Sequence, residues 1–382
     1  MSSTQSTDDP AERAQRWAAT MQGHLAGGVA LAHEDSWAGT GSSGAAGRVE
    51  REEREHLTLS RLATRAHGAG DRAHPEEPDP WRTCFERDRD RILHASAFRR
   101  LAGKTQVFVF PDDHQRTRMT HALEVAQVAR SVAGPIGLNV TLAEAIAVGH
   151  DCGHGPGGHA SEDAFTPYLD GGYDHAVWGA DETLVPLNLC VETLDGIRNH
   201  SWSRPAPSTP EGEVVSWADR IAYVCHDFED AVAAGIVSAE MLPAIVSSRC
   251  GSTRSRQLGT FVRAMIDATI ETGRIGMTAP IAEALSEFRR FNYENIYLRP
   301  ASKAQAEAVI TMLRALVEHY ADRPHLLADE RVDVPRDLSA GSPEALRAAV
   351  SWVSGMTDRY ACRQAMALLR WDREQLPIGI DV

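Results

Sequence analysis

The 382-residue sequence predicts an all-α protein. From about residue 50 onward, apolar residues recur every three or four positions in one segment after another, which is the spacing of amphipathic helices. Strict alternation of apolar and polar residues is absent apart from one candidate ribbon around "TQVFVFPDD" (105–113). No internal repeat of fixed period occurs, which argues against a solenoid. We therefore expect a single, mainly helical domain over 49–382.

The residues before this domain are expected to form a disordered arm over 1–48. They are rich in Ala, Gly, Ser and charged residues, and "WAGTGSSGAAG" (37–47) is typical of a flexible linker. Within the arm, only "AERAQRWAATMQ" (11–22) has the composition of a short helix.

Composition and charge narrow the classes of partner. The formal net charge of −14 argues against nucleic acid as the main partner, because a polyanion is attracted by a basic surface. No window approaches the roughly 18 consecutive apolar residues of a membrane span, and the N-terminus lacks the pattern of a signal peptide. The six cysteines form no CxxC pair, which fits reduced thiols. We expect a cytoplasmic protein without a membrane partner.

The first strongly helical segment of the domain, 86–108, places Ile92, Phe98 and other apolar residues at helical spacing. The same segment holds six basic residues against two acidic ones between Arg87 and Lys104. This excess of positive charge is either a solvated helix face with i,i+4 ion pairs or a patch for an anionic substrate.

The next two helices carry ionisable residues where burial is expected. The segment 116–135 places His121 on a stripe with three valines and stops at a Gly-Pro pair. The segment 139–151 stacks two apolar residues with His150 at i, i+4 and i+8, and ends with Asp151. Both helices therefore direct polar groups toward the core.

The helix expected over 212–235 continues this pattern, because Asp219, Tyr223 and Asp227 share one face with Val215. Further amphipathic segments follow at 240–249, 259–273, 281–297, 303–321 and 343–369.

The buried imidazoles and carboxylates require compensation, because an unpaired carboxylate in the core is strongly destabilising. A divalent metal supplies it, and imidazole together with carboxylate suits Mn, Fe, Zn, Ni or Mg. A lone histidine or His-Asp pair means little, but this conjunction on three helices favours one divalent metal per site. The expected ligands are His121, His150, Asp151 and Asp219.

The order of the motifs along the chain resembles that of one family. The matching stretches are "RDRDRILHASAFRRLAGKTQVF", "RTRMTHALEVAQVARSVA", "AIAVGHDCGHGPGGHASEDAF", "NLCVETLDGIRNH", "ADRIAYVCHDFEDAVAAGIV" and "VSGMTDRYA", between residues 87 and 361. They resemble the HD-domain phosphohydrolases, specifically the dGTPase-like deoxynucleoside triphosphate (dNTP) triphosphohydrolases. The resemblance implies an HD-domain helical bundle with additional C-terminal helices and an HD core at about 115–235.

The resemblance also implies roles for individual residues. The four candidate ligands would hold a metal that polarises the α-phosphate, and His159, oriented by Glu162, would transfer a proton. The resemblance also places His154 in this catalytic group, and the alternative for His154 is a structural hydrogen bond. The expected substrate contacts are Arg100, Lys104 and Arg118 for the triphosphate, Gln106 for the sugar or base, and Tyr223 with Asp227 for the deoxyribose.

Two departures from the family pattern bear on the substrate. Gly157 stands where relatives carry the aromatic residue of a Pro-Phe-Gly run, which leaves the packing of the pocket open. After His175, Ala176 and its two successors replace the polar residues of relatives. Preference for a nucleobase is therefore not readable from the sequence.

The expected activity is metal-dependent hydrolysis of dGTP or several dNTPs to deoxynucleoside and tripolyphosphate. Two alternatives stay open: an HD phosphohydrolase acting on nucleoside monophosphates, and a non-catalytic nucleotide sensor. The resemblance further implies a homo-oligomer, hexameric or tetrameric, and a dNTP activator.

Overall fold

The computed structural model describes residues 9–20, 23–37, 39–41, 44–108, 115–330, 335 and 337–377. The chain divides into two units, Met1–Ala46 and Gly47–Val382. This division lies close to the boundary expected between 48 and 49, and the single-domain organisation of 49–382 stays a prediction.

The first unit contains more regular structure than the expected disordered arm. Helix α1 (Pro10–Thr20) coincides with the short helix that the composition allowed. Strands β1 (His24–Ala26) and β2 (Val29–Leu31) pair antiparallel around a two-residue Gly-Gly turn. The hairpin was not expected, because strands of three residues are too short to show alternation.

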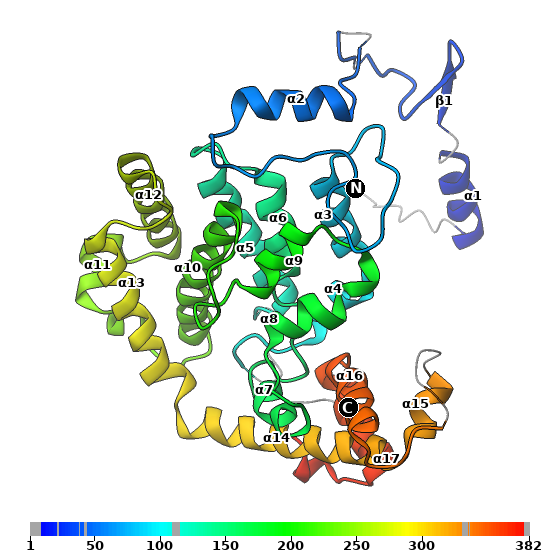
Figure 1. Ribbon diagram of the computed structural model, residues 1–382, viewed down its shortest axis with the longest axis vertical. Helices are drawn as coiled ribbons and strands as arrows, with labels where there is room; N and C mark the ends of the chain where they lie inside the picture. Colours follow the sequence, from blue (N-terminus) through cyan, green and yellow to red (C-terminus); the bar gives the residue numbers. More distant parts are fainter. Residues whose placement is uncertain are drawn as a thin grey trace, which may run out of the picture. The chain divides into compact units, whose positions relative to one another are not determined.

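The second unit is built from helices, and the expected all-α fold class is confirmed (Figure 1). Its helices are α2 (Arg48–Thr58), α3 (Cys84–His94), α4 (Ser96–Arg100), α5 (Arg118–Ala133), α6 (Val140–Gly149), α7 (Ala160–Phe165), α8 (His175–Trp178), α9 (Val191–Arg198), α10 (Pro210–Ala233), α11 (Ala244–Cys250), α12 (Arg254–Thr272), α13 (Ala279–Asn292), α14 (Pro300–Ala321), α15 (Pro324–Glu330), α16 (Pro343–Ser354) and α17 (Asp358–Leu369). Among the described helices, none combines the length and apolarity needed to span a bilayer.

The ribbon expected around 105–113 is described only in part. Thr105 forms an isolated antiparallel bridge with Thr117, just before α5, while residues 109–114 lie outside the described residues.

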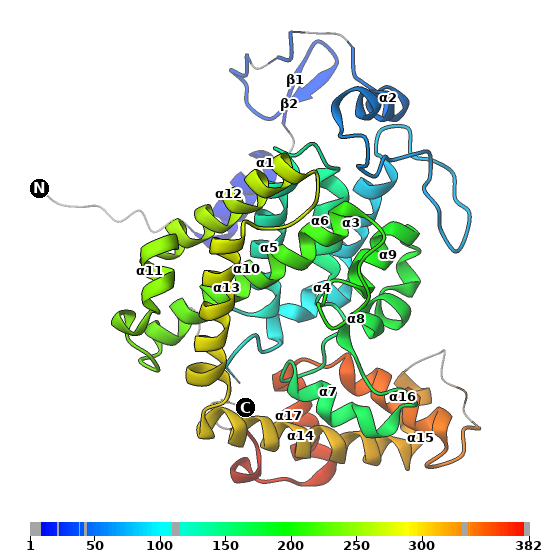
Figure 2. The ribbon, with the colours of Figure 1, turned by 60° about the vertical axis from the view of Figure 1, so that its left-hand side comes forward.

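The larger core lies among α3, α5, α6, α9 and α10, where α6 packs between α3 and α5 and α10 packs on α5 (Figures 1 and 2). Val125, Val128 and Val132 of α5 are fully buried there, as their spacing predicts. Each such side chain contributes about 1.5–3 kcal/mol when removed from water. This packing fixes the three helices that carry the candidate metal ligands.

A second core is formed by the C-terminal helices together with α7. In Figures 1 and 2, the long helix α14 runs beside α7, with α16 and α17 on the same side of the unit. Val309, Leu313 and Leu316 of α14 are buried in this core with Phe165 of α7. The segment after the His150-Asp151 pair is thereby attached to the C-terminal helices.

The start of α6 is capped by Asn139, whose side-chain oxygen accepts from the backbone N–H of Leu142 at 3.2 Å. The Glu144 carboxylate pairs with Arg89 at 3.2 Å and with Arg130. The ordered start of α6 fixes its far end, where His150 and Asp151 lie.

Candidate metal centre

Three helices bring the four candidate ligands together. His121 lies on α5, His150 and Asp151 follow the last turn of α6, and Asp219 lies on α10. The Oδ1 atom of Asp219 lies 3.0 Å from Nε2 of His121 and 3.7 Å from Nε2 of His150. Oδ1 of Asp151 lies 3.4 Å from the same His150 nitrogen.

The chemistry of this group fits a divalent metal. Nδ1 of His150 donates to the carbonyl of Ala147 at 2.6 Å, so Nε2 carries the free lone pair. That Nε2 is buried and has no hydrogen-bond partner among the described residues. Burial alone would raise the pKa of Asp219, but the hydrogen bond with His121 and the neighbouring imidazoles hold it well below its usual value. His121, His150 and Asp219 therefore form a set that could hold a metal.

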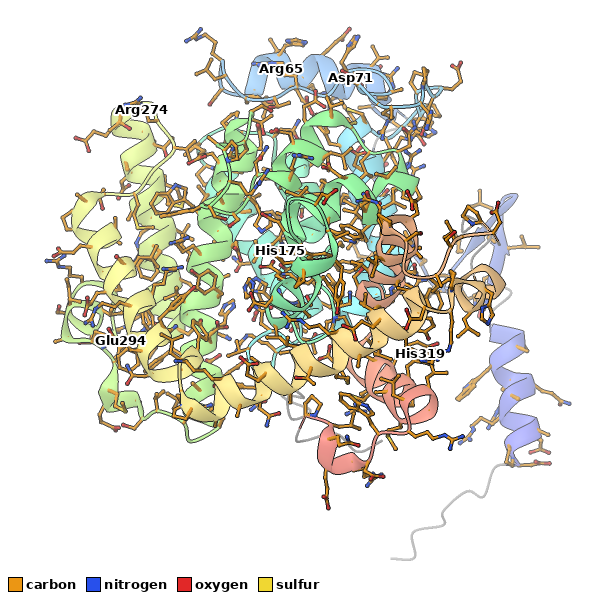
Figure 3. All side chains as sticks on the ribbon, turned by 60° about the horizontal axis from the view of Figure 1, so that its bottom comes forward. Arg65, Asp71, His175, Arg274, Glu294 and His319 are labelled. Atoms are coloured by element: carbon orange, nitrogen blue, oxygen red, sulfur yellow. The ribbon has the colours of Figure 1, made fainter. Side chains whose placement is uncertain are left out.

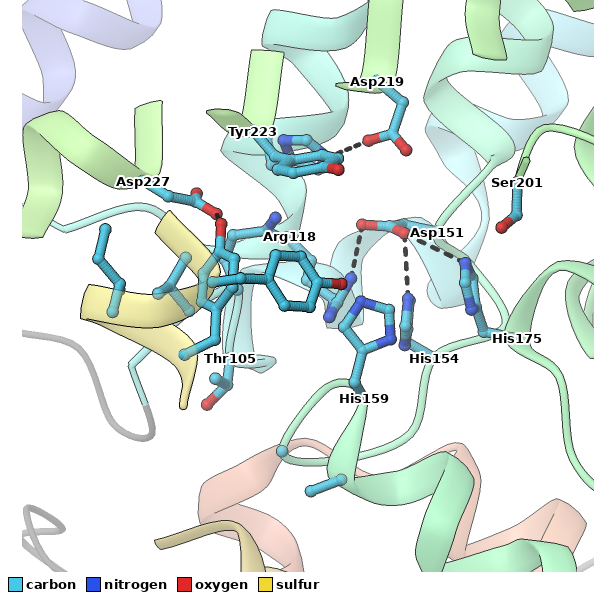
Figure 4. A pocket seen from close by; sticks show the side chains of 18 of the residues that line it. Thr105, Arg118, Asp151, His154, His159, His175, Ser201, Asp219, Tyr223 and Asp227 are labelled. Carbon is cyan, nitrogen blue, oxygen red and sulfur yellow. Dashed lines mark hydrogen bonds and ion pairs between the residues drawn. The ribbon is translucent and has the colours of Figure 1, made fainter. Parts of the chain in front are cut away.

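Arg118 orients the second carboxylate of the group. Its Nη1 donates to Oδ2 of Asp151 at 2.8 Å, which leaves Oδ1 facing the imidazoles (Figure 4). Nε and Nη2 of the same guanidinium are buried without a hydrogen-bond partner among the described residues. These two nitrogens can donate hydrogen bonds to an anion in the cavity.

A second cluster lies beside the first and contains the three residues expected to be catalytic. His154, His159 and Glu162 gather there with His175 from α8. Glu162 hydrogen-bonds Nδ1 of His175, whereas its other oxygen lies 3.7 Å from Nδ1 of His159. The carboxylate thus holds His175 more closely than His159, and the expected orientation of His159 by Glu162 stays a prediction. Three-residue spacing brings His159 near, but tertiary packing brings His175 nearer.

His175 and His200 continue this cluster inward, and we predicted no role for either from the sequence. His175 lies in the interior of the unit, while Arg274 and Glu294 lie at its edge (Figure 3). Nδ1 of His200 donates to the carbonyl of Ile197 at 2.8 Å, so its Nε2 accepts from Nε2 of His175 at 3.2 Å. Burial lowers the pKa of His200 to about 4, which keeps this ring neutral. The only sequence signal was the "RNH" run in a matching stretch.

Both clusters open into one cavity of about 620 Å³. Arg118, His121, Asp151 and Asp219 line it with His154, His159 and His175. Figure 4 shows Asp151 between Arg118, His154 and His175. The cavity is large enough for a nucleotide-sized ligand.

Tyr223 and Asp227, the expected deoxyribose contacts, also line the cavity. The Tyr223 hydroxyl accepts from Nε of Arg289 at 2.7 Å, and the Tyr297 hydroxyl donates to Oδ2 of Asp227. Oδ1 of Asp227 is buried without a partner among the described residues, and burial raises the pKa of this carboxyl to about 7. Arg289 and Tyr297 were missed because their segment, 281–297, showed only helical periodicity.

The residues expected to bind the triphosphate, together with Gln106, separate into two groups. Arg118 and Gln106 line the cavity, and the Gln106 carbonyl oxygen has no partner among the described residues. Arg100 and Lys104 are not among the described residues that line it. The Lys104 ammonium instead donates to the carbonyls of His154 and Ser354, and burial lowers its pKa to about 7. The number of basic residues in a segment does not show which of them face the cavity and which bond the backbone inside the core.

Gly157, where the resemblance led us to expect an aromatic ring, lines the cavity. Its φ is +72°, and a Cβ there would lie 2.4 Å from Cγ1 of Val309, so α14 fills the space. Ala176 is fully buried and does not line the cavity. Of the three residues that replace the polar run after His175, Ala176 and Trp178 therefore belong to the core, whereas Val177 is partly exposed.

Two family models and several known proteins match this chain. Residues 118–224 match the HD domain, and residues 275–367 match the phosphohydrolase-associated domain. The chain is 38% identical to the deoxyguanosinetriphosphate triphosphohydrolase-like protein of Caldanaerobacter subterraneus subsp. tengcongensis, covering 81% of this chain and 92% of that protein. Proteins of the same description from Clostridium perfringens and Desulfatibacillum aliphaticivorans are 37% and 34% identical, with 94% and 95% of their lengths covered.

Proposed function

Since the chain belongs to the deoxyguanosinetriphosphate triphosphohydrolase-like family of HD-domain phosphohydrolases, we propose that it hydrolyses dNTPs to deoxynucleoside and tripolyphosphate with one divalent metal. One observation carries the proposal. The group of His121, His150, Asp151 and Asp219 lies at a cavity whose lining residues Arg118, Gln106 and Asp227 have side-chain atoms without a hydrogen-bond partner among the described residues.

The metal would be held by these four side chains and, when bound, supplies Lewis-acid polarisation of the α-phosphate. Arg118 binds the phosphate through its two unpartnered N–H groups while it keeps Asp151 in place. Its planar guanidinium suits this double task, because its donors point in fixed directions.

The proton required by the leaving group comes from the histidine cluster. Water adds its oxygen to the α-phosphorus and gives up one proton, the bond from phosphorus to the 5′-oxygen breaks, and a proton must reach that 5′-oxygen. The His159 imidazole is exposed and lines the cavity, so it delivers this proton. His154 and Glu162 orient the cluster, with Glu162 acting mainly through His175.

The sugar lies against Tyr223, with its 3′-hydroxyl donating to Asp227. The unpartnered Oδ1 of Asp227 supports this contact, and a sugar held there would bring its 2′ position toward the Tyr223 ring, which would exclude a 2′-hydroxyl. Deoxyribonucleotides are therefore the preferred substrates.

A product-resolved assay tests the proposal. Purified protein is incubated with Mn²⁺ or Mg²⁺ and each of the four dNTPs, alone and in mixtures. Deoxynucleoside and tripolyphosphate in equal amounts are expected. Release of dNMP and pyrophosphate, turnover of monophosphates only, or no turnover in any mixture contradicts it.

Activation by a second dNTP and assembly into a hexamer or tetramer are parts of the same proposal. Activation predicts that a non-hydrolysed dNTP increases the rate with another in the mixtures. Light scattering during the assay determines whether the active species is the oligomer.

A further inference from the structure

One buried carboxylate connects the C-terminal helices to two edges of the cavity. Asp358, the first residue of α17, is 4% exposed. Its Oδ1 accepts from the backbone N–H of Gly157 at 2.9 Å, and its Oδ2 accepts from the backbone N–H and the hydroxyl of Thr105 at 2.8 and 2.6 Å. Three donors thus converge on one side chain from segments about 50 residues apart.

Both contacted segments carry groups that face the cavity. Thr105 lines the cavity and precedes Gln106, which does so as well. Gly157 lies two residues before His159 on the loop that follows the candidate metal ligands. Asp358 is not among the described residues that line the cavity, so it can affect a ligand only through these two segments.

Lys104 reinforces the same connection. Its ammonium donates to the carbonyl of His154 on the loop and to that of Ser354 at the end of α16, the latter at 2.9 Å. The C-terminal helices therefore hold the loop at both His154 and Gly157.

The backbone at Gly103 and the N-terminus of α17 pack in close contact. A Cβ at Gly103 would lie 2.9 Å from Cγ2 of Thr357, the residue before Asp358. Only glycine at position 103 lets the N-terminus of α17 reach Thr105 without displacement. The carboxylate is thus placed by packing as well as by hydrogen bonds.

We propose that Asp358 is a positioning residue for the phosphohydrolase reaction, holding the 154–159 loop and the Thr105–Gln106 edge in register. The proposal rests on the function proposed above. Without the carboxylate, the loop carrying His159 gains freedom, and a misplacement of about 1 Å can cost about 100-fold in rate. The metal group is fixed separately by α5, α6 and α10, so metal content should not change.

Glu211 provides a matched control for Asp358. It is fully buried and accepts from the backbone N–H and hydroxyl of Thr64, at 3.1 and 2.7 Å, and from the backbone N–H of Asn139 at 2.9 Å. These are the same kinds of donor, but neither partner lines the cavity. Asp358→Asn and Glu211→Gln therefore remove equivalent bonds in different places.

Steady-state kinetics on dNTPs separates positioning from general stability. Asp358→Asn is expected to lower kcat about 10–100-fold, with KM within about threefold and one metal per chain retained, whereas Glu211→Gln keeps kcat within about threefold. Equal kcat in the two variants overturns the proposal. If Asp358→Asn does not fold, Thr105→Val, which removes only the hydroxyl donor, must lower kcat while Thr105→Ser preserves it; equal kcat in those two overturns it as well.

Amide hydrogen exchange gives a readout independent of turnover. The N–H groups of Gly157 and Thr105 donate to different oxygens of Asp358, and Asn keeps only one of these acceptors. Asp358→Asn should therefore increase exchange at Thr105 or at Gly157, and Glu211→Gln should change neither. Unchanged exchange at both positions overturns the proposal. An inactive wild-type protein would refute the proposed function, while the exchange measurement still decides whether Asp358 holds the two edges.

Discussion

Arg118 and Asp151 form a buried ion pair at the cavity, with Nη1 and Oδ2 2.8 Å apart. The pair directs the other carboxylate oxygen toward His150 and leaves two donors of the guanidinium unused. One side chain thus connects the candidate metal group with the candidate phosphate site.

Replacing Arg118 by lysine tests this double role. Lysine keeps the charge but cannot hold Asp151 and a phosphate at once, so kcat/KM should fall about 100-fold. Arg116→Lys is the matched control, because Arg116 pairs with Glu124, Glu229 and Asp230 and does not line the cavity. Equal losses in the two variants would contradict the assignment.

Asp219→Asn should weaken metal binding at least tenfold, because an amide replaces the charged oxygen beside two imidazoles. Metal content per chain, measured by elemental analysis after dialysis at several free Mn²⁺ concentrations, checks this. Asp230→Asn on the same helix, whose carboxylate pairs with Arg116, should keep its metal. Retention of metal in Asp219→Asn would remove this residue from the ligand set.

Tyr223 is expected to distinguish deoxyribose from ribose through its ring. Tyr223→Ala should reduce the ratio of kcat/KM for dGTP over GTP about tenfold, since the space beside the sugar opens. Tyr223→Phe loses only the hydroxyl that accepts from Arg289, so it should keep the ratio. An unchanged ratio in both variants would show that the sugar lies elsewhere.

The buried carboxyl of Asp227 should make stability depend on pH. Because burial raises its pKa to about 7, the folded protein holds the proton more tightly than the unfolded chain, whose value is about 3.9. The resulting stabilisation is complete below about pH 4 and is lost as the pH rises through about 7. Asp227→Asn should therefore gain Tm relative to wild type between pH 5 and 7.5, with no further gain above. Parallel Tm curves would contradict this.

Helical periodicity predicted the parts of the site that depend on local spacing. The stripes on α5, α6 and α10 brought His121, His150 and Asp219 to one place, because a residue on an apolar face must meet the core. The four-residue spacing of Asp219, Tyr223 and Asp227 likewise placed all three along one cavity wall.

Contacts between distant segments could not be predicted in this way. His175 contacts Glu162 from α8, and Arg289 reaches Tyr223 from α13, across separations that no periodicity encodes. The charge of Lys104 was likewise misleading. It suits a phosphate ligand, but the ammonium donates to two backbone carbonyls in the core. Local patterns define faces, and only packing decides which faces meet.

The proposed reaction is tested most directly by following the oxygen of water during turnover. In ¹⁸O-labelled water with Mn²⁺ and dGTP, one label should enter tripolyphosphate for each bond broken, and none should enter the 5′-hydroxyl of deoxyguanosine. That result means attack on the α-phosphorus with loss of the 5′-oxygen, as in the proposed reaction. Label in pyrophosphate, in inorganic phosphate released alone, or in a deoxynucleoside monophosphate would contradict the proposed reaction.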